Sequence, residues 1–316
     1  MMSLRVVFMG TPGFARGVLE RLTTSTHQVV GVVTVADKPA GRGQKLSTSA
    51  VKDFAVEQNL PLLQPTNLKD EAFTEALRSW NADVFVVVAF RMLPKSVWSM
   101  PKCGTFNLHA SLLPQYRGAA PINWAIINQE TKTGVTTFFI DDKIDTGAMI
   151  MHRTTEISER ETFESLHDKL LAIGRELVVE TLDGIFQATI EPKIQLETET
   201  LREAPKLNKD NTKIDWNKDC TEVDALIRGL SPYPTAWTLF AEGETTSAAK
   251  IFLATPKPEL NSIEVGKIEV IGKELLVGCG SGALKIEELQ LAGKKRVRAI
   301  DFINGLNRQK TQEFTS

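Results

Sequence analysis

The first part of the chain alternates between short apolar runs and longer stretches in which apolar residues recur at helical spacing. The runs are nearly continuous in apolar residues, which is typical of strands buried on both faces of a parallel sheet. We expect such strands at Leu4–Met9, Val29–Val35, Asp83–Phe90, Thr105–His109 and Val135–Ile140. Helices are predicted at Phe14–Leu22, Ser49–Asn59, Lys69–Trp80 and Glu164–Leu182. This order predicts an α/β domain with a doubly wound, mostly parallel, Rossmann-like sheet.

The pattern changes near Gln187, where helical spacing ends and a polar, acidic stretch begins. We interpret residues 190–206 as a linker. After it, short strands separated by glycines and polar turns predict a small β-barrel (OB-like) or a sandwich. These strands are expected at Ala236–Phe240, Lys250–Ala254, Gly266–Val270, Leu275–Gly278 and Leu284–Leu289. The predicted domains are therefore 1–189 and 207–316.

Composition supports a globular protein and excludes several classes. The 316 residues are 42% hydrophobic and 24% charged, which suits two domains with cores of their own. The longest apolar run, Val84–Phe90, is far shorter than the roughly 20 residues that span a bilayer. The first run, Leu4–Met9, lacks the pattern of a signal peptide, so we expect a cytoplasmic protein without a membrane partner.

Cysteines and histidines give no sign of a metal centre or a disulfide framework. The cysteines are odd in number and far apart, and the four histidines lack ligand spacing. We therefore expect free thiols and no metal at these positions: Cys103, Cys220, Cys279, His27, His109, His152 and His167. The net charge of −2 argues, taken alone, against a nucleic-acid partner.

The strongest candidate for chemistry is the strand that ends at His109. Asn107 and His109 are two residues apart on a predicted strand, so their side chains project from the same face, while Phe106 and Leu108 face the core. Asp145 follows the next apolar strand and can reach the same sheet edge. An amide and an imidazole can stabilise a tetrahedral oxyanion, and a carboxylate can orient the imidazole.

Less specific interpretations of these residues stay open at this point. A single histidine on a strand is more often a core or surface residue, and Asp145 stands in an acidic loop that water alone could solvate. No side-chain nucleophile stands beside His109. Direct transfer between donor and acceptor therefore fits better than a covalent enzyme intermediate.

Several motifs in order make a resemblance specific. FNLHASLLPQYRGAAPINWAI is followed by DDKIDTGAM, and the chain also contains VVFMGTPGFA, ADKPAGRGQKLSTSAVK, KLNKDNTKIDW and LQLAGKKRVRAIDFING. Over essentially its full length the sequence resembles the 10-formyltetrahydrofolate-dependent N-formyltransferase family, in particular those members that formylate methionyl-tRNA. Other members act on amino-sugar nucleotides or hydrolyse 10-formyltetrahydrofolate, and these remain alternatives. The presence of Asn107, His109 and Asp145 together argues against a non-catalytic RNA-binding module.

The resemblance implies roles for individual residues. It places catalysis at Asn107, His109 and Asp145, with 10-formyltetrahydrofolate as the formyl donor and initiator methionyl-tRNA as the acceptor. Contacts to the folate co-substrate are implied at Ser111, Leu112, Leu113, Pro114, Phe90, Arg91, Met92, Leu93 and Asp142.

Basic residues provide candidate contacts to tRNA. A basic, glycine-rich loop contains Lys38, Arg42 and Lys45, and residues 294–298 hold four cations in five positions. Each could be a solvated loop. The resemblance favours contacts to tRNA phosphates or bases from Lys38, Arg42, Lys45, Lys206, Lys294, Lys295 and Arg296. We expect the protein to act as a monomer.

Overall fold

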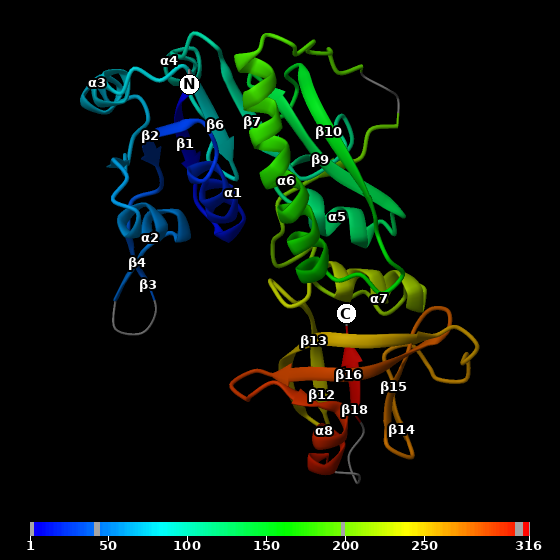
Figure 1. Ribbon diagram of the computed structural model, residues 1–316. Helices are drawn as coiled ribbons and strands as arrows, with labels where there is room; N and C mark the ends of the chain where they lie inside the picture. The colour runs from blue at the N-terminus through cyan, green and yellow to red at the C-terminus, as the bar shows by residue number, and fades with distance from the viewer. Residues whose placement is uncertain (1–2, 41–44, 197–199, 307–311, 316) are drawn as a thin grey trace. The chain divides into compact units, whose positions relative to one another are not determined.

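The computed structural model describes residues 3–40, 45–196, 200–306 and 312–315 (Figure 1). The chain forms two compact units that do not follow chain order. The first unit comprises Met1–Pro121, Thr133–Thr155 and His167–Glu203, and the second comprises Ile122–Lys132, Glu156–Leu166 and Ala204–Ser316. The boundaries predicted above, at 189 and 207, stay a prediction.

The first unit is built on a seven-stranded sheet in the order β10-β9-β7-β6-β1-β2-β5. The pairs β1–β2, β1–β6, β2–β5 and β6–β7 are parallel, and β7–β9 is antiparallel. The mostly parallel sheet is therefore confirmed. Its strands are β1 (Arg5–Gly10), β2 (Gln28–Val33), β5 (Leu62–Leu63), β6 (Val84–Val88), β7 (Thr105–His109), β9 (Lys132–Phe139) and β10 (Met149–Glu156).

Helices cover both faces of this sheet, as the doubly wound prediction requires. One face carries a core in which residues of α3 and α4 pack on Val7, Phe85 and Val87. On the other face, Gly174 of α6 lies so close to Leu108 that a Cβ there would be 2.9 Å from it. The helices are α1 (Gly13–Thr23), α2 (Ala50–Glu57), α3 (Glu71–Ser79), α4 (Lys95–Trp98) and α6 (Phe163–Phe186).

Short elements that the sequence pattern did not predict complete the first unit. Two short strands flank the predicted basic loop: β3 (Lys38–Ala40) pairs antiparallel with β4 (Lys45–Ser47), as in a hairpin. Two further short strands are β8 (Arg117–Gly118) and β11 (Glu203–Ala204). Strands of two or three residues are too short to show a hydrophobic period, so the sequence pattern did not predict them.

The second unit contains an antiparallel barrel. Its sheet runs β14-β15-β16-β13-β12-β18, with β17 beside β16. The sheet closes on itself, because Lys267 bridges Glu313 antiparallel and the Phe314 amide donates to the Gly266 carbonyl at 2.7 Å. The barrel, rather than the sandwich, is therefore the observed form. Its strands are β12 (Ala236–Glu242), β13 (Thr245–Lys257), β14 (Ile268–Ile271), β15 (Glu274–Gly278), β16 (Ala283–Leu291), β17 (Val297–Arg298) and β18 (Gln312–Thr315).

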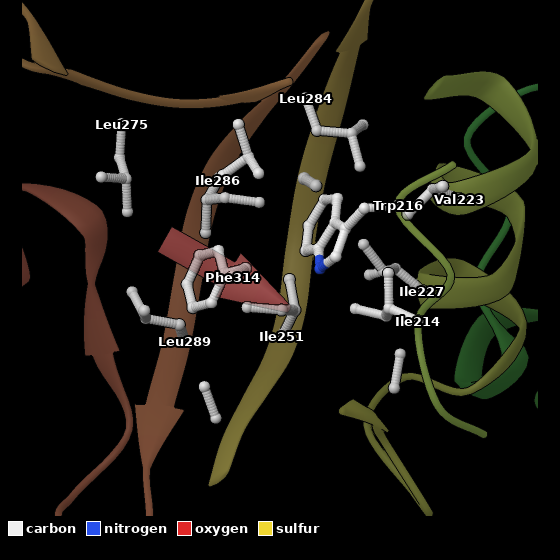
Figure 2. Packing of buried hydrophobic residues seen from close by; sticks show 14 of the residues in the cluster. Ile214, Trp216, Val223, Ile227, Ile251, Leu275, Leu284, Ile286, Leu289 and Phe314 are labelled. Carbon is white, nitrogen blue, oxygen red and sulfur yellow. The ribbon is translucent and has the colours of Figure 1, made fainter. Parts of the chain in front are cut away.

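The barrel core is closed by aromatic packing. Trp216 and Phe314 stack with ring centroids 5.7 Å apart, and Figure 2 shows Ile251, Ile286 and Leu289 around them. The Trp216 indole is satisfied by the Thr238 hydroxyl at 2.9 Å. The remaining helices are α5 (Pro121–Ile127), α7 (Cys220–Gly229) and α8 (Ala299–Gly305).

Ion pairs to the buried Asp224 link the segment 156–166 to the rest of the second unit. Asp224 of α7 accepts from Arg228 at 2.7 Å and from Arg160 at 2.8 Å, and Arg160 also donates to the Ala254 carbonyl.

Among the helices within the described ranges, none combines the length and apolarity that crossing a bilayer would need.

Candidate active site

Asn107 and His109 stand at the end of β7, an interior strand of the sheet of the first unit. Val87 is the parallel partner of Asn107, and paired residues point to the same face. Asn107 and His109 therefore project toward the face that carries Val87, while Phe106 and Leu108, which are fully buried, point toward the α6 face. The expected alternation holds, and it brings both polar side chains to one side of the strand.

The hydrogen bond made by His109 fixes its tautomer. His109 is 6% exposed, and its Nε2 lies 2.8 Å from the Tyr116 carbonyl oxygen. A carbonyl can only accept, so Nε2 carries the proton. In the neutral ring Nδ1 therefore bears the lone pair and is the atom that can take up or give a proton.

Asp145 approaches the free nitrogen of this imidazole. Its Oδ2 lies 3.8 Å from His109 Nδ1, which is too long for a hydrogen bond but close enough for charge attraction. The same oxygen accepts from the Gly118 amide at 2.9 Å, and the side chain is only 12% exposed. Asp145 is therefore held beside His109 rather than solvated in its acidic loop.

Asn107 contributes an unused acceptor. Its Oδ1 is buried and accepts no hydrogen bond in the part of the chain that the structure describes. Leaving such an atom unpaired costs about 1–3 kcal/mol. A buried polar atom without a partner, two residues from a histidine with a free ring nitrogen, fits a site in which a ligand N–H completes the pairing.

The turn after β7 is fixed from within. The Ser111 hydroxyl donates to the Gln115 carbonyl at 2.6 Å, so it is occupied by the turn itself. The Thr136 hydroxyl donates to the Ser111 carbonyl at 2.7 Å and accepts from the Leu113 amide at 3.2 Å. Any contact of Ser111–Pro114 with a ligand therefore involves backbone or apolar atoms more readily than the serine hydroxyl.

A pocket of about 550 Å³ in the first unit follows the end of β6, and none of Asn107, His109 and Asp145 is among its lining residues. It gathers Arg91, Met92, Leu93 and Asp142, four of the predicted folate contacts, whereas Phe90 and Ser111–Pro114 are not among its lining residues. Arg91 donates to the carbonyls of Thr66, at 3.0 Å, and Pro65, and its buried Nε has no partner among the described residues. The other lining residues are Thr66, Asn67, Leu68, Lys69, Pro94, Lys95 and Trp98.

Comparison with known proteins decides the family. The family model described as formyl transferase matches residues 4–182, and that described as formyl transferase, C-terminal domain, matches residues 206–307. The chain belongs to the formyl transferase family.

Relatives within the formyl transferase family cover nearly the whole chain. The sequence is 55% identical to the methionyl-tRNA formyltransferase of Flavobacterium psychrophilum over 97% of both chains. It is 50% identical to the methionyl-tRNA formyltransferase of Bacteroides thetaiotaomicron, over 96% of this chain and 95% of that one.

Solved structures support the formyl transferase fold. HypX from Aquifex aeolicus, in complex with tetrahydrofolic acid, aligns with a TM-score of 0.65 at 18% identity, over 96% of this chain and 47% of that one. The N-formyltransferase from Helicobacter canadensis, in complex with folinic acid and dTDP-3-aminofucose, aligns with a TM-score of 0.64 at 21% identity, over 93% of this chain and all of that one.

Of the basic residues predicted to contact tRNA, those whose side chains the structure describes are exposed. Lys38 is exposed at the start of β3, whereas Arg42 and the side chain of Lys45 lie outside what the structure describes. In the second unit Lys206, Lys294 and Lys295 are exposed. Arg296 is bound to Glu288 and stacks over Phe252, 4.3 Å from its ring centre, so its charge is already partnered.

Sequence reasoning missed three groups that hold the site. The Tyr116 carbonyl and the Gly118 amide are backbone groups, and a residue's name does not reveal them. The left-handed backbone of Tyr116, with φ of 60°, turns its segment back toward His109. The third is Gln195, whose side-chain amide donates to the Asp145 carbonyl at 2.9 Å although its segment resembles a polar linker.

Proposed function

We propose that the protein transfers the formyl group of 10-formyltetrahydrofolate to the α-amine of methionine esterified to initiator tRNA. One observation carries this proposal. Asp145, His109 with its proton on Nε2, and Asn107 with its unpaired Oδ1 gather at one end of the sheet, in a chain 55% identical over nearly its full length to a protein named methionyl-tRNA formyltransferase. The proposed catalytic residues are these three.

The reaction forms one bond and breaks one. The amine attacks the formyl carbon, and a tetrahedral oxyanion results. The bond from carbon to N10 then breaks, and the proton lost by the amine ends on N10. A free α-amine titrates at about 7.7–8.0, and esterification lowers that value, so the amine needs no strong base. Holding the oxyanion and moving the proton are the demanding tasks.

We propose that three side chains carry out these tasks. His109 Nε2 already donates to Tyr116, so His109 can donate to the oxyanion only through a protonated Nδ1. Asp145, 3.8 Å away, offsets the positive charge of that form and relays the proton. The Asn107 amide group donates to the oxyanion, and its unpaired Oδ1 accepts an N–H of the attacking amine.

The site fits a folate co-substrate. The pocket of about 550 Å³ is within the size range of ligand sites, and it combines the apolar Trp98 and Leu93 with the cation Arg91. We propose that Arg91, Met92, Leu93 and Asp142 line the folate site, with backbone contacts from Phe90 and Ser111–Pro114. The bound co-substrate supplies the formyl group.

For tRNA we propose contacts from two regions. The segment that bears Lys38, Arg42 and Lys45 reaches the acceptor end, and Lys206, Lys294 and Lys295 of the second unit contact phosphates. Arg296 is already paired with Glu288, so we do not count it among the phosphate contacts. We further propose a cytoplasmic monomer with domains at 1–189 and 207–316.

A direct assay tests the function. Purified protein and 10-formyltetrahydrofolate are incubated with charged initiator tRNA, free methionine, an amino-sugar nucleotide or no acceptor. We expect formyl transfer to methionyl-tRNA alone. Transfer to the sugar, or release of formate without an acceptor, would instead establish one of the alternatives named above.

A histidine pair tests the mechanism in the same assay. His109→Ala removes an oxyanion donor, so kcat should fall on the order of 10²–10³-fold. His152→Ala, on an exposed position of β10, is the matched control and should leave kcat unchanged. Near-normal turnover by His109→Ala would refute the proposed mechanism.

A further inference from the structure

The segment around Gln195 has an inverted pattern of exposure. The Lys193 amide and carbonyl pair with those of Met149 at 2.8 Å each, so the segment is extended there. Ile194 and Leu196 are 82% and 76% exposed, whereas Gln195 is only 6% exposed. Packing alone would favour the reverse, with the apolar side chains inside. The buried amide must therefore be explained by its contacts.

Each polar group of Gln195 is used. Its Nε2 donates to the Asp145 carbonyl at 2.9 Å and to the Gly147 carbonyl at 2.8 Å. Its Oε1 accepts from the Nε and a terminal nitrogen of Arg117, at 3.1 and 2.8 Å. A side-chain amide has two donor hydrogens and one acceptor oxygen on adjacent atoms, which matches two carbonyls and a guanidinium. A carboxylate offers no donor, and an ammonium offers no acceptor.

The groups that Gln195 holds are those that place the Asp145 carboxylate. Asp145 has φ of 55°, a left-handed conformation that costs a non-glycine residue about 1–3 kcal/mol unless its surroundings impose it. Two residues further on, Gly147 packs directly against the backbone of β9. A Cβ at this position would lie 1.6 Å from the Phe139 carbonyl oxygen, so the loop can approach the strand this closely only with glycine here. The carboxylate is held by the Gly118 amide, and Gly118 follows Arg117 in the chain. Gln195 thus joins both segments that position Asp145.

We propose that Gln195 is a positioning residue for catalysis: its amide clamps the loop 145–147 to the segment 117–118 and so holds the Asp145 carboxylate beside His109. This rests on the proposed function, because it assumes that Asp145 takes part in formyl transfer. The segment predicted to be a passive linker then completes the active site.

Two substitutions separate the parts of the clamp. Gln195→Ala removes all its contacts, and Gln195→Glu keeps the acceptor for Arg117 but cannot donate to the two carbonyls. Since a misplacement of about 1 Å can cost on the order of 10²-fold in rate, we expect kcat to fall about 10- to 100-fold in both. KM for the folate and for methionyl-tRNA should stay within about twofold, because neither is held by Gln195. The Gly118 amide should exchange hydrogen faster in both variants.

A double variant tells positioning from general structural damage. If Gln195 acts through Asp145, Asp145→Ala/Gln195→Ala should be no slower than Asp145→Ala, because the carboxylate to be positioned is already gone. Gln187→Ala and Ile194→Ala, at exposed positions nearby, are the controls and should leave kcat and the Gly118 exchange rate unchanged.

The outcomes separate this inference from the proposed function. No product from the unsubstituted protein, or full activity of Asp145→Ala, would overturn the function or its catalytic assignment. If the protein is active and Asp145→Ala is impaired, the inference alone is at stake. Normal kcat in Gln195→Ala or Gln195→Glu, unchanged exchange at Gly118, or a double variant in which the two losses multiply would each show it to be wrong.

Discussion

Asn107 combines an energetic cost with a proposed catalytic role. Its buried, unpartnered Oδ1 should make the ligand-free site less stable than an apolar residue would. We therefore predict that Asn107→Ala lowers kcat on the order of 10²–10³-fold yet leaves the thermal midpoint of unfolding equal or higher. Both are measured on the same preparation, by the formylation assay and by scanning calorimetry.

A buried hydroxyl with partners supplies the contrast. Thr181 is fully buried in α6, where its hydroxyl donates to the Leu177 carbonyl at 2.7 Å and lies 2.9 Å from that of Thr137. Thr181→Val should lower the midpoint, because the buried Thr137 hydroxyl then loses its hydrogen bond to the Thr181 hydroxyl. If Asn107→Ala lowers the midpoint as much as Thr181→Val does, the unpaired Oδ1 of Asn107 does not destabilise the ligand-free site.

At single positions, the sequence could predict which side chains lie together but not which backbone groups hold them in place. Asn107 and His109 could be predicted as neighbours because alternation on a strand is a local rule. The position of Asp145 beside His109 depends on Gly118 and Gln195, which are 27 and 50 residues away in the chain. No local pattern indicates that a glutamine flanked by Ile194 and Leu196 turns inward, since the usual expectation for such a segment is the opposite.

Among the elements, the β3–β4 hairpin begins directly after a cluster of polar contacts at Asp37. The Asp37 carboxylate accepts from Lys52 of α2 and from Gln64 at 2.8 Å, and Gln64 also donates to the Val35 carbonyl at 2.8 Å. The hydrogen bond from Lys52, followed by that from Gln64, lowers the pKa of Asp37 below its usual value. The ionised carboxylate is thus the form that holds the hairpin base together.

The lowered pKa of Asp37 determines how the stability of the hairpin should depend on pH. A carboxyl whose pKa is depressed on folding stabilises the fold above its unfolded pKa of about 3.9, and the contribution is lost as pH falls through the lower, folded value. We predict that backbone amides of β3 and β4 exchange faster, after correction for intrinsic rates, below about pH 4. Asp37→Asn should show this faster exchange already at pH 7, measured by mass spectrometry.

An exposed aspartate on the adjoining helix serves as the control. Asp53→Asn on α2 keeps the clamp intact, so exchange in the hairpin should match that of the unsubstituted protein. Equal exchange in Asp37→Asn and Asp53→Asn at pH 7 would show that the carboxylate does not hold the hairpin.

Elements with a clear hydrophobic period were predicted, whereas β10 (eight residues), α7 (ten residues) and the strands of two or three residues were not. The predicted buried strands and amphipathic helices lie within a few residues of their expected bounds, because burial on both faces or on one stripe leaves a clear period. The hairpin strands have only three residues each, and their pairing is a relation between two segments rather than a local pattern.

The interleaving of the two units is likewise a relation between distant segments. Residues 122–132 and 156–166 belong to the second unit, although strands of the first unit lie between them along the chain. The Arg160–Asp224 contact joins positions 64 residues apart, and no composition shift marks it. Hydrophobic periodicity defines elements one at a time, so this level of organisation comes only from the structure.

The whole-molecule charge of −2 conceals how individual cations are used. In the run at 294–298, Arg296 is bound to Glu288 and Arg298 lies 3.3 Å from Asp301. Lys294 and Lys295 are exposed, and neither ammonium group has a carboxylate partner within the described residues. Only these two lysines of the run remain available to release counterions from a nucleic-acid backbone.

The salt dependence of tRNA binding measures whether Lys294 and Lys295 contact phosphates. We predict that Lys294→Gln/Lys295→Gln reduces the slope of log K against log salt by about 1 for each lysine that contacts a phosphate, while kcat at saturating tRNA is unchanged. Arg296→Gln is the matched control, because its charge is already neutralised by Glu288, and its slope should equal that of the unsubstituted protein. A slope that falls in Arg296→Gln but not in the lysine variant would reverse the assignment of the phosphate contacts.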